Sequence, residues 1–321
     1  MKNKILVTGC AGFIGFHLSN FLLKKKYKVI GIDNLNNYYD VSLKKERLKI
    51  LKKNKDFEFY KFDLSKKKFI SKIKHHRINK IFHFAAQAGV RYSLKYPERY
   101  LSSNVEATFH LLNFAKNYNI KYFIFASSSS VYGKSKKNKF TETDNTDNPI
   151  QFYAATKKTS EIMIRSYSEL YNINCKILRF FTVYGPYGRP DMAVFSFVKK
   201  IMNKQTINLY NFGNHSRDFT YIDDVIKGIY KTSFKEKLKE QKFNIYNIAA
   251  GKNEKLIKLV KIIVEKLEKK AKIKYVSLQL GDMKNTHANI DKIKKLYRNH
   301  KPTSLEKGIE AFIKWYKGFY K

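Results

Sequence analysis

The feature that most constrains the fold is a glycine-rich turn near the start of the chain, TGCAGFIG at residues 8–15. An apolar run, KILVTG, precedes the turn and an amphipathic segment follows it, which is the pattern of a strand, a turn and a helix. Gly9, Gly12 and Gly15 allow backbone N–H groups to approach a phosphate closely, and the helix N-terminus favours its negative charge. The spacing is Gly-x-x-Gly-x-x-Gly. The turn therefore predicts a β-α unit that binds a nucleotide phosphate.

Asp33 ends the next apolar run, YKVIGID at 27–33. A carboxylate there accepts hydrogen bonds from the adenosine ribose hydroxyls and repels a 2′-phosphate, so Asp33 favours NAD over NADP. Asp33 and Asn34 could instead simply start a turn. Asp63 ends a third apolar run, FEFYKFD at 57–63, and Leu64 follows it. These two residues could face the adenine of the nucleotide, or Asp63 could simply cap a helix.

Apolar and amphipathic segments alternate over the first 181 residues. Strands are expected at 4–9, 27–33, 57–63, 80–86, 121–128 and 174–181, and helices near 13–25, 42–53, 66–74, 98–117 and 152–171. This alternation predicts an α/β fold, a Rossmann-type doubly wound parallel sheet. Further on, helices are expected near 192–203, 222–232, 254–269 and 303–318, with a possible strand at 243–249. We expect an NAD-binding Rossmann domain (1–181, with 219–250 returning to it) and a smaller C-terminal substrate-binding lobe (182–218 and 251–321).

The formal net charge of the 321-residue chain is +39, which raises the question of a nucleic-acid partner. The lysines spread over every expected helix and form no stripe, so we expect no nucleic-acid binding. No apolar run reaches the ~18 residues of a membrane span. Cys10 and Cys175 suggest no disulfide framework, and the eight histidines show no metal-ligand spacing. A soluble cytoplasmic protein without a metal is expected.

A second motif, YAATK at 153–157, starts the helix expected at 152–171. Tyr153 and Lys157 are four residues apart and share one helix face. A free tyrosine has a pKa near ~10, and a nearby ammonium and a cationic nicotinamide would both favour the phenolate. Tyr153 could then take a proton from a sugar hydroxyl. Ser128, in ASSSSVYG at the end of a strand, is expected to hydrogen-bond the reacting oxygen. On its own, a Tyr-x-x-x-Lys pair is also common on ordinary helix surfaces.

Together these motifs resemble the extended short-chain dehydrogenase/reductase superfamily, which includes NAD-dependent nucleotide-sugar epimerases and dehydratases. Longer stretches look like UDP-glucuronate 4-epimerases from end to end of the chain. They are DNLNNYYDVSLKKERL (33–48), HFAAQAGVRYSLKYP (83–97), RFFTVYGPYGRPDMA (179–193), RDFTYIDD (217–224) and KPTSLEKGIEAFIKWY (301–316).

The resemblance implies reversible C4 epimerisation of UDP-glucuronate to UDP-galacturonate through a 4-keto intermediate, with tightly bound NAD. It implies the catalytic residues Ser128, Tyr153 and Lys157. The implied NAD-binding residues are Gly9, Gly12, Phe13, Ile14, Gly15, Asp33, Asn34, Asp63, Leu64, Ala85, Ala86, Gln87, Asn104, Tyr153 and Lys157. The implied substrate-binding residues are Gln87, Ser128, Ser129, Thr182, Arg189, Arg217 and Asp282. It also implies a homodimer packed through the helices near 98–117 and 152–171, and a role in polysaccharide biosynthesis.

Arg189 follows the turn Gly185-Pro186 and suits the C6 carboxylate of a glucuronate, because its planar fork matches a carboxylate. It could instead be a loop arginine that pairs with Asp191. Thr182 and Gln279 stand where galactose-type epimerases usually carry Asn and Arg, which favours the acid sugar.

Three other functions stay open on the sequence alone. A UDP-glucuronate decarboxylase would release CO2 and form a pentose, and a neutral UDP-sugar 4-epimerase would act on an uncharged sugar. A catalytically inactive nucleotide-binding protein would retain the fold without the reaction, although the presence of Ser128, Tyr153 and Lys157 argues against it.

Overall fold

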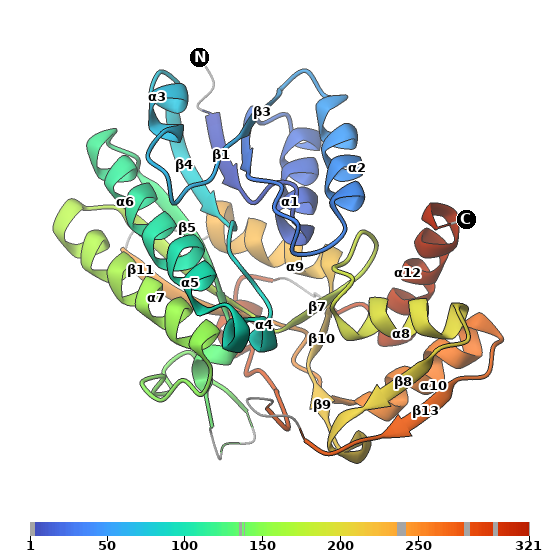
Figure 1. Ribbon diagram of the computed structural model, residues 1–321. Helices are drawn as coiled ribbons and strands as arrows, with labels where there is room; N and C mark the ends of the chain where they lie inside the picture. Colours follow the sequence, from blue (N-terminus) through green and yellow to red (C-terminus); the bar gives the residue numbers. More distant parts are fainter. Residues whose placement is uncertain are drawn as a thin grey trace.

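Seven parallel strands form the centre of the computed structural model (Figure 1), which describes residues 4–134, 137, 139–235, 242–278, 283–297 and 301–320. Their order across the sheet is β11-β6-β5-β4-β1-β2-β3, and every neighbouring pair is parallel. The strands are β1 (Lys4–Thr8), β2 (Val29–Asp33), β3 (Phe57–Lys61), β4 (Ile78–His83), β5 (Tyr122–Ser128), β6 (Asn174–Phe180) and β11 (Phe243–Ile248). The predicted doubly wound parallel sheet is confirmed.

Both faces of the sheet are buried, because apolar side chains alternate between the faces along each strand. In β1, Ile5 and Val7 belong to a core with Phe16 of α1, whereas Leu6 packs in a second core with Leu111 of α6. Figure 1 shows α6 and α7 on one face of the sheet and α1 and α9 on the other. The helices and helical turns around the sheet are α1 (Phe13–Lys24), α2 (Val41–Lys52), α3 (Phe69–Ile73), α4 (Val90–Lys95), α5 (Pro97–Tyr100), η1 (Leu101–Glu106), α6 (Ala107–Asn117), η2 (Ser129–Tyr132), α7 (Phe152–Tyr171), α9 (Ile222–Tyr230), η4 (Lys231–Lys235) and α11 (Asp291–Lys294).

Two elements differ from their sequence-based predictions. The strand expected at 80–86 ends at His83, because Thr8 Oγ1 accepts hydrogen bonds from the N–H groups of Phe84 and Ala85 at 3.1 and 3.2 Å and turns the chain out of the sheet. The helix expected at 98–117 contains a π-helical turn, η1, between α5 and α6. The hydroxyl of Thr108, in the first turn of α6, donates to the carbonyl of Asn104 in η1 at 2.5 Å.

A second lobe lies beside the carboxyl ends of the strands (Figure 1). Its core includes Val198, Leu259 and Phe312, one from each of three helices. The helices are α8 (Ala193–Met202), α10 (Leu256–Leu267) and α12 (Leu305–Phe319), and the lobe also contains the helical turn η3 (Tyr210–Gly213). Three short strand pairs complete the lobe: β7 (Thr182–Tyr184) with β10 (Phe219–Tyr221), β8 (Thr206–Leu209) with β13 (Lys272–Tyr275), and β9 (Ser216–Arg217) with β12 (Glu254–Lys255). The division of the chain at residues 181, 218 and 250 stays a prediction. Each helix among the described residues is too short or too polar to span a lipid bilayer.

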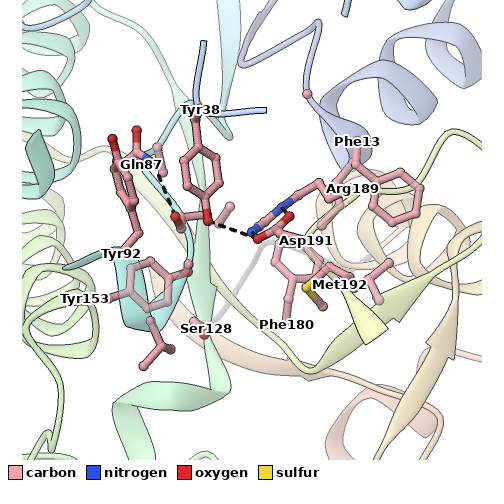
Figure 2. Close-up of a pocket in the computed structure, with 18 of the residues that line it drawn as sticks. Phe13, Tyr38, Gln87, Tyr92, Ser128, Tyr153, Phe180, Arg189, Asp191 and Met192 are labelled. Carbon is pink, nitrogen blue, oxygen red and sulfur yellow. Dashed lines mark hydrogen bonds and ion pairs between the residues drawn. The ribbon is translucent and has the colours of Figure 1, made fainter. Parts of the chain in front are cut away.

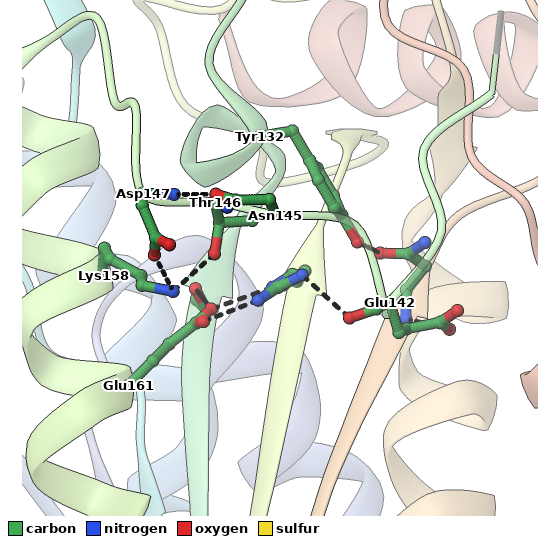
Figure 3. Close-up of polar contacts among 10 residues, drawn as sticks. Tyr132, Glu142, Asn145, Thr146, Asp147, Lys158 and Glu161 are labelled. Atoms are coloured by element: carbon green, nitrogen blue, oxygen red, sulfur yellow. Dashed lines mark hydrogen bonds and ion pairs between the residues drawn. The ribbon is translucent and has the colours of Figure 1, made fainter. Parts of the chain in front are cut away.

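A buried ion pair between Arg179 of β6 and Glu161 of α7 fastens the helix to the sheet (Figure 3). Arg179 Nε and Nη2 donate to the two carboxylate oxygens of Glu161 at 3.0 and 2.8 Å. The exposed fractions of the two side chains are 2% and 4%. Arg179 Nη1 also donates to the carbonyl of Glu142 at 3.4 Å, and Lys158 of α7 donates to Thr146 at 2.6 Å. Strand, helix and the loop before α7 therefore meet at one polar junction.

The substitution Glu161→Gln leaves the charge of Arg179 buried without a counter-charge. We expect the free energy of unfolding to fall by about 3–5 kcal/mol. Urea denaturation of the purified protein measures this loss. The control is Lys258→Ala, which breaks a solvent-facing pair with Glu254 and should cost about 0–1 kcal/mol. Similar losses in the two variants would contradict the weight given to the buried pair.

Candidate active site

A pocket of about 960 Å³ lies between the central sheet and the second lobe. It opens at the carboxyl ends of the parallel strands, where open α/β sheets bind ligands. Most residues predicted for the site line it. From the first part of the chain these are Gly9, Gly12, Phe13, Ile14, Gly15, Asp33, Asn34, Asp63, Leu64, Ala85, Ala86 and Gln87; further along they are Ser128, Ser129, Tyr153, Lys157, Thr182, Arg189 and Arg217. Asp282 and Gln279 lie outside the described residues.

The glycine turn has a conformation that only glycines can form. Gly9 has a φ of +71°, and a Cβ atom on Gly9 would lie 2.6 Å from the backbone nitrogen of Ala85. A Cβ on Gly15 would lie 2.1 Å from the carbonyl oxygen of Gly9. Helix α1 starts after Gly12 with no side-chain cap, so its first N–H groups are left for a ligand. Because this turn lines the pocket, it fits the pyrophosphate of NAD.

Asp33, at the end of β2, lies beside the glycine turn. Its carboxylate accepts hydrogen bonds from the backbone N–H groups of Ala11 and Leu35 at 3.1 and 2.9 Å. Burial raises the pKa of Asp33, while these N–H groups and the nearby Lys44 act in the opposite direction. Asn34 donates to the carboxylate of Asp63 at 3.3 Å, which joins the ends of β2 and β3. The polar groups at these two strand ends fit the adenosine part of a dinucleotide.

The cofactor-binding role of Asn104 stays a prediction, and Asn104 is not among the described residues that line the pocket. It lies behind the pocket wall, where its side chain accepts from the N–H of Gln87 at 2.8 Å and donates to the carbonyl of Gln87 at 3.1 Å. The same amide donates to Thr156 of α7 at 3.0 Å. Asn104 therefore fixes the backbone of Gln87 and connects it to the helix that carries Tyr153.

Ser128, Tyr153 and Lys157 come together in the pocket, from the end of β5 and the first two turns of α7. Figure 2 shows Tyr153 and Ser128 close to each other. The ammonium of Lys157 is buried, donates to the carbonyl of Ala126 at 2.8 Å and lies 4.7 Å from the ring centroid of Phe125.

The pKa of Tyr153 depends on burial and on two residues to which the sequence gave other roles. Burial raises this pKa, and a hydrogen bond with Ser128 and the charge of Arg189 lower it. Burial also lowers the pKa of Lys157 to about 7, against the opposing charge of Glu161. Burial outweighs the other two groups, so the pKa of Tyr153 stays above its ordinary value, and Ser128 and Arg189, not Lys157, are the groups that favour the phenolate.

Arg189 lies in the pocket and pairs with Asp191 (Figure 2). Its Nε and Nη2 donate to the two carboxylate oxygens of Asp191 at 3.0 and 2.5 Å. The hydroxyl of Tyr38, from the loop after β2, donates to Asp191 Oδ2 at 3.0 Å. The ion pair between Arg189 and Asp191, which the sequence left as an alternative to carboxylate binding, is therefore present, and both residues line the pocket.

A second arginine, Arg47 of α2, holds the turn that presents Arg189. The Arg47 side chain is fully buried, and its Nη1 donates to the carbonyl of Ala11 in the glycine turn at 2.8 Å. Its Nη2 donates to the carbonyls of Tyr187 and Gly188 at 2.6 and 3.2 Å. The guanidinium of Arg47 thus connects the glycine turn to the turn that precedes Arg189.

The second lobe contributes Arg217, whose Nη1 donates to the carbonyl of Lys284 at 2.8 Å. It also contributes Tyr210, which the sequence analysis missed. Arg91 of α4 stacks on Tyr210, with 4.4 Å between its Cζ and the ring centroid, and both residues line the pocket. Tyr38 and Arg91 fall within motif stretches that carried the family resemblance, so a signal for them existed. Tyr210 has no such signal, because its contact depends on how the lobes meet.

Known proteins resemble this chain over its whole length. Residues 5–249 match the profile described as the NAD dependent epimerase/dehydratase family. A UDP-glucuronate 4-epimerase of Thermodesulfobacterium geofontis is 42% identical over 315 residues, which cover 97% of this chain and 95% of that protein. An uncharacterized protein of Methanocaldococcus jannaschii is 45% identical over 320 residues, with coverage of 98% and 97%. The crystal structure of a UDP-glucuronic acid 4-epimerase from Bacillus cereus, in complex with UDP-glucuronic acid and NAD, superposes with a TM-score of 0.90 at 33% identity and covers 99% of this chain and 100% of that chain.

The glycine turn provides a test of cofactor binding. In Gly15→Ala the added Cβ would lie 2.1 Å from the carbonyl oxygen of Gly9, so the turn must distort. We expect this variant to lose most of its NAD, measured as nucleotide released from the denatured purified protein. Gly318→Ala is the matched control, because no atom lies within 4 Å of its added Cβ. Equal NAD content in the two variants would show that the turn does not hold the cofactor.

Proposed function

Because the chain belongs to the NAD dependent epimerase/dehydratase family, we propose that it interconverts UDP-glucuronate and UDP-galacturonate by inverting C4 of the sugar. Relatives and solved structures that match nearly the whole chain carry this activity in their names. The observation that carries the proposal is the presence of Arg189 in the same pocket as Ser128, Tyr153 and Thr182. An arginine suited to a carboxylate thus lines the same pocket as the groups suited to C4 chemistry.

The glycine turn and Asp33 would hold the pyrophosphate and the adenosine of NAD, and Lys157 would lie near its nicotinamide ribose. NAD, when bound, would supply the hydride acceptor for C4 on one face of the sugar and the hydride donor on the other. Tyr153 accepts the proton of the C4 hydroxyl and later gives it back. Ser128 lowers the pKa of Tyr153 and so favours the phenolate that this step needs.

Arg189 would bind the C6 carboxylate, with Thr182, Ser128 and Ser129 contributing hydroxyl groups. The 4-keto sugar formed on oxidation is a β-keto acid, which loses CO2 when its carboxylate is aligned with the ketone. An epimerase must therefore hold this carboxylate out of alignment while the sugar turns over about its diphosphate link. Arg217, Gln87 and Asp282 are proposed for the nucleotide-sugar pocket on the family pattern.

The activity is tested by NMR of purified protein with UDP-glucuronate and no added cofactor. We expect an equilibrium mixture with UDP-galacturonate, and a rate that falls by about 10²–10⁴-fold or more in Tyr153→Phe. Tyr171→Phe, at the far end of the same helix, is the control that should keep the wild-type rate.

Other products would redirect the proposal. A UDP-pentose and CO2 from the wild-type protein would indicate a decarboxylase. Conversion of UDP-glucose alone would indicate a neutral-sugar epimerase, and no conversion of any UDP-sugar would indicate a non-catalytic nucleotide-binding protein. A normal rate in Tyr153→Phe would remove Tyr153 from its role.

We further propose a homodimer formed through α6 and α7. These helices lie next to each other on the outside of the sheet, linked by a hydrogen bond from Tyr167 to Asn113 at 2.9 Å (Figure 1). Large apolar side chains are exposed there, including Ile162 and Leu170 with exposed fractions of 58% and 69%. Exposed apolar side chains on two adjacent helices favour a protein interface.

The double substitution Ile162→Lys/Leu170→Lys places two charges in this face. Sedimentation velocity should show a dimer for the wild-type protein and a monomer for the variant. Tyr275→Lys, at an exposed position of β13 in the second lobe, is the control that should remain dimeric. A dimeric double variant would move the interface elsewhere.

A further inference from the structure

Arg189 uses only one edge of its guanidinium for contacts with the described part of the chain. Nε and Nη2 face the carboxylate of Asp191, and the remaining nitrogen, Nη1, makes no hydrogen bond or ion pair with a described residue. An arginine fork has a second bidentate edge, formed by Nη1 and the other N–H of Nη2. The pair thus leaves one carboxylate-binding edge unused in a pocket proposed to take a carboxylate.

Asp191 is itself held in place from outside its own loop. The hydroxyl of Tyr38 donates to Asp191 Oδ2 at 3.0 Å, and the two residues are 153 positions apart in the chain. The side chain of Tyr38 is closely packed on two sides. Its ring centroid lies 4.8 Å from that of Tyr92, and its hydroxyl is so near Gly89 that a Cβ atom on that glycine would lie 2.1 Å from it. The residues Tyr38, Asp191 and Arg189 therefore connect two loops that line the pocket, the loop after β2 and the loop before α8 (Figure 2).

We propose that Asp191 is a positioning residue, which holds Arg189 so that its Nη1–Nη2 edge keeps the C6 carboxylate of the 4-keto sugar out of alignment with the ketone. This inference rests on the proposed epimerase function. Asp191 does not attract the substrate, since it neutralises the charge of Arg189. Its contribution is to the direction of the guanidinium and not to the strength of binding.

If the guanidinium of Arg189 loses this orientation, the expected side reaction is decarboxylation of the 4-keto sugar. When the carboxylate aligns with the ketone, the C5–C6 bond breaks and CO2 leaves. The electron pair of that bond moves onto the C4 oxygen as an enolate, and a proton is taken up at C5. Return of the hydride to C4 then gives a UDP-pentose. A loosely held Arg189 should therefore raise the fraction of turnovers that end in CO2.

The test is Asp191→Asn, assayed with UDP-glucuronate labelled with ¹³C at C6. The amide keeps the shape of the side chain but loses the charge and one acceptor oxygen. We expect kcat for epimerisation to fall about tenfold or more, as for loss of a charged hydrogen bond, with KM unchanged or lower because Arg189 regains its net charge. The ratio of labelled CO2 to UDP-galacturonate should rise about tenfold. Tyr38→Phe, which removes only the hydrogen bond to Asp191, should change both quantities in the same direction by less.

Several controls keep the outcome clear. Asp147→Asn, in an exposed ion pair with Lys158 away from the pocket, should match the wild-type protein. If Asp191→Asn does not fold, Tyr38→Phe still decides the question. A raised KM with unchanged kcat and CO2 ratio would overturn the proposal, and so would tighter binding with full kcat and no CO2. If the wild-type protein does not epimerise UDP-glucuronate, the proposed function fails first, so the two failures are distinguishable.

Discussion

The architecture of the pocket depends on a buried arginine that never faces the substrate. Arg47 has no exposed surface, and its guanidinium bridges the carbonyl of Ala11 in the glycine turn and the carbonyls of Tyr187 and Gly188. A charge at such depth needs hydrogen-bond partners; the two terminal nitrogens of Arg47 have them, whereas Nε has none among the described residues. The backbone must therefore bring these carbonyls together, and His17 of α1 adds a contact to the carbonyl of Pro186 at 2.9 Å. The phosphate-binding turn and the turn before Arg189 are consequently set against each other by the fold.

A second set of buried polar contacts fixes the part of the pocket wall that contains Gln87 and Tyr153. His83 lies between the hydroxyls of Thr8 and Thr108 at 2.8 and 3.0 Å, and burial together with the charge of Lys157 lowers its pKa to about 3. A neutral imidazole can thus link the first strand to α6 at any ordinary pH. Thr108 donates to the carbonyl of Asn104 in η1, and the side chain of Asn104 reaches Gln87 and the helix of Tyr153. The first strand and the helix that carries the catalytic residues are therefore connected through buried polar groups.

The central sheet could be predicted because its strands are apolar on both faces and end in small or polar residues, as in β1 and β2. The strands of the second lobe could not, since β8 and β13 are four residues each and β13 places only Ile273, half-buried, between the exposed Lys272 and Lys274. Motif residues such as Tyr153 and Arg189 were found because their local pattern is distinctive. The position of Asn104 behind the wall and the stack of Arg91 on Tyr210 depend on contacts between distant segments, which no local pattern contains.

Residues on different sides of helix α7 have three different roles. Its first turns carry Tyr153 and Lys157, Glu161 ties it to the sheet, and Ile162 and Leu170 face outward. If a second copy covers that outer side, the helix would be held more firmly when protein is abundant than when it is dilute. Turnover per subunit would then depend on the concentration of the enzyme itself, and dilution would weaken the active site without any change in substrate or cofactor.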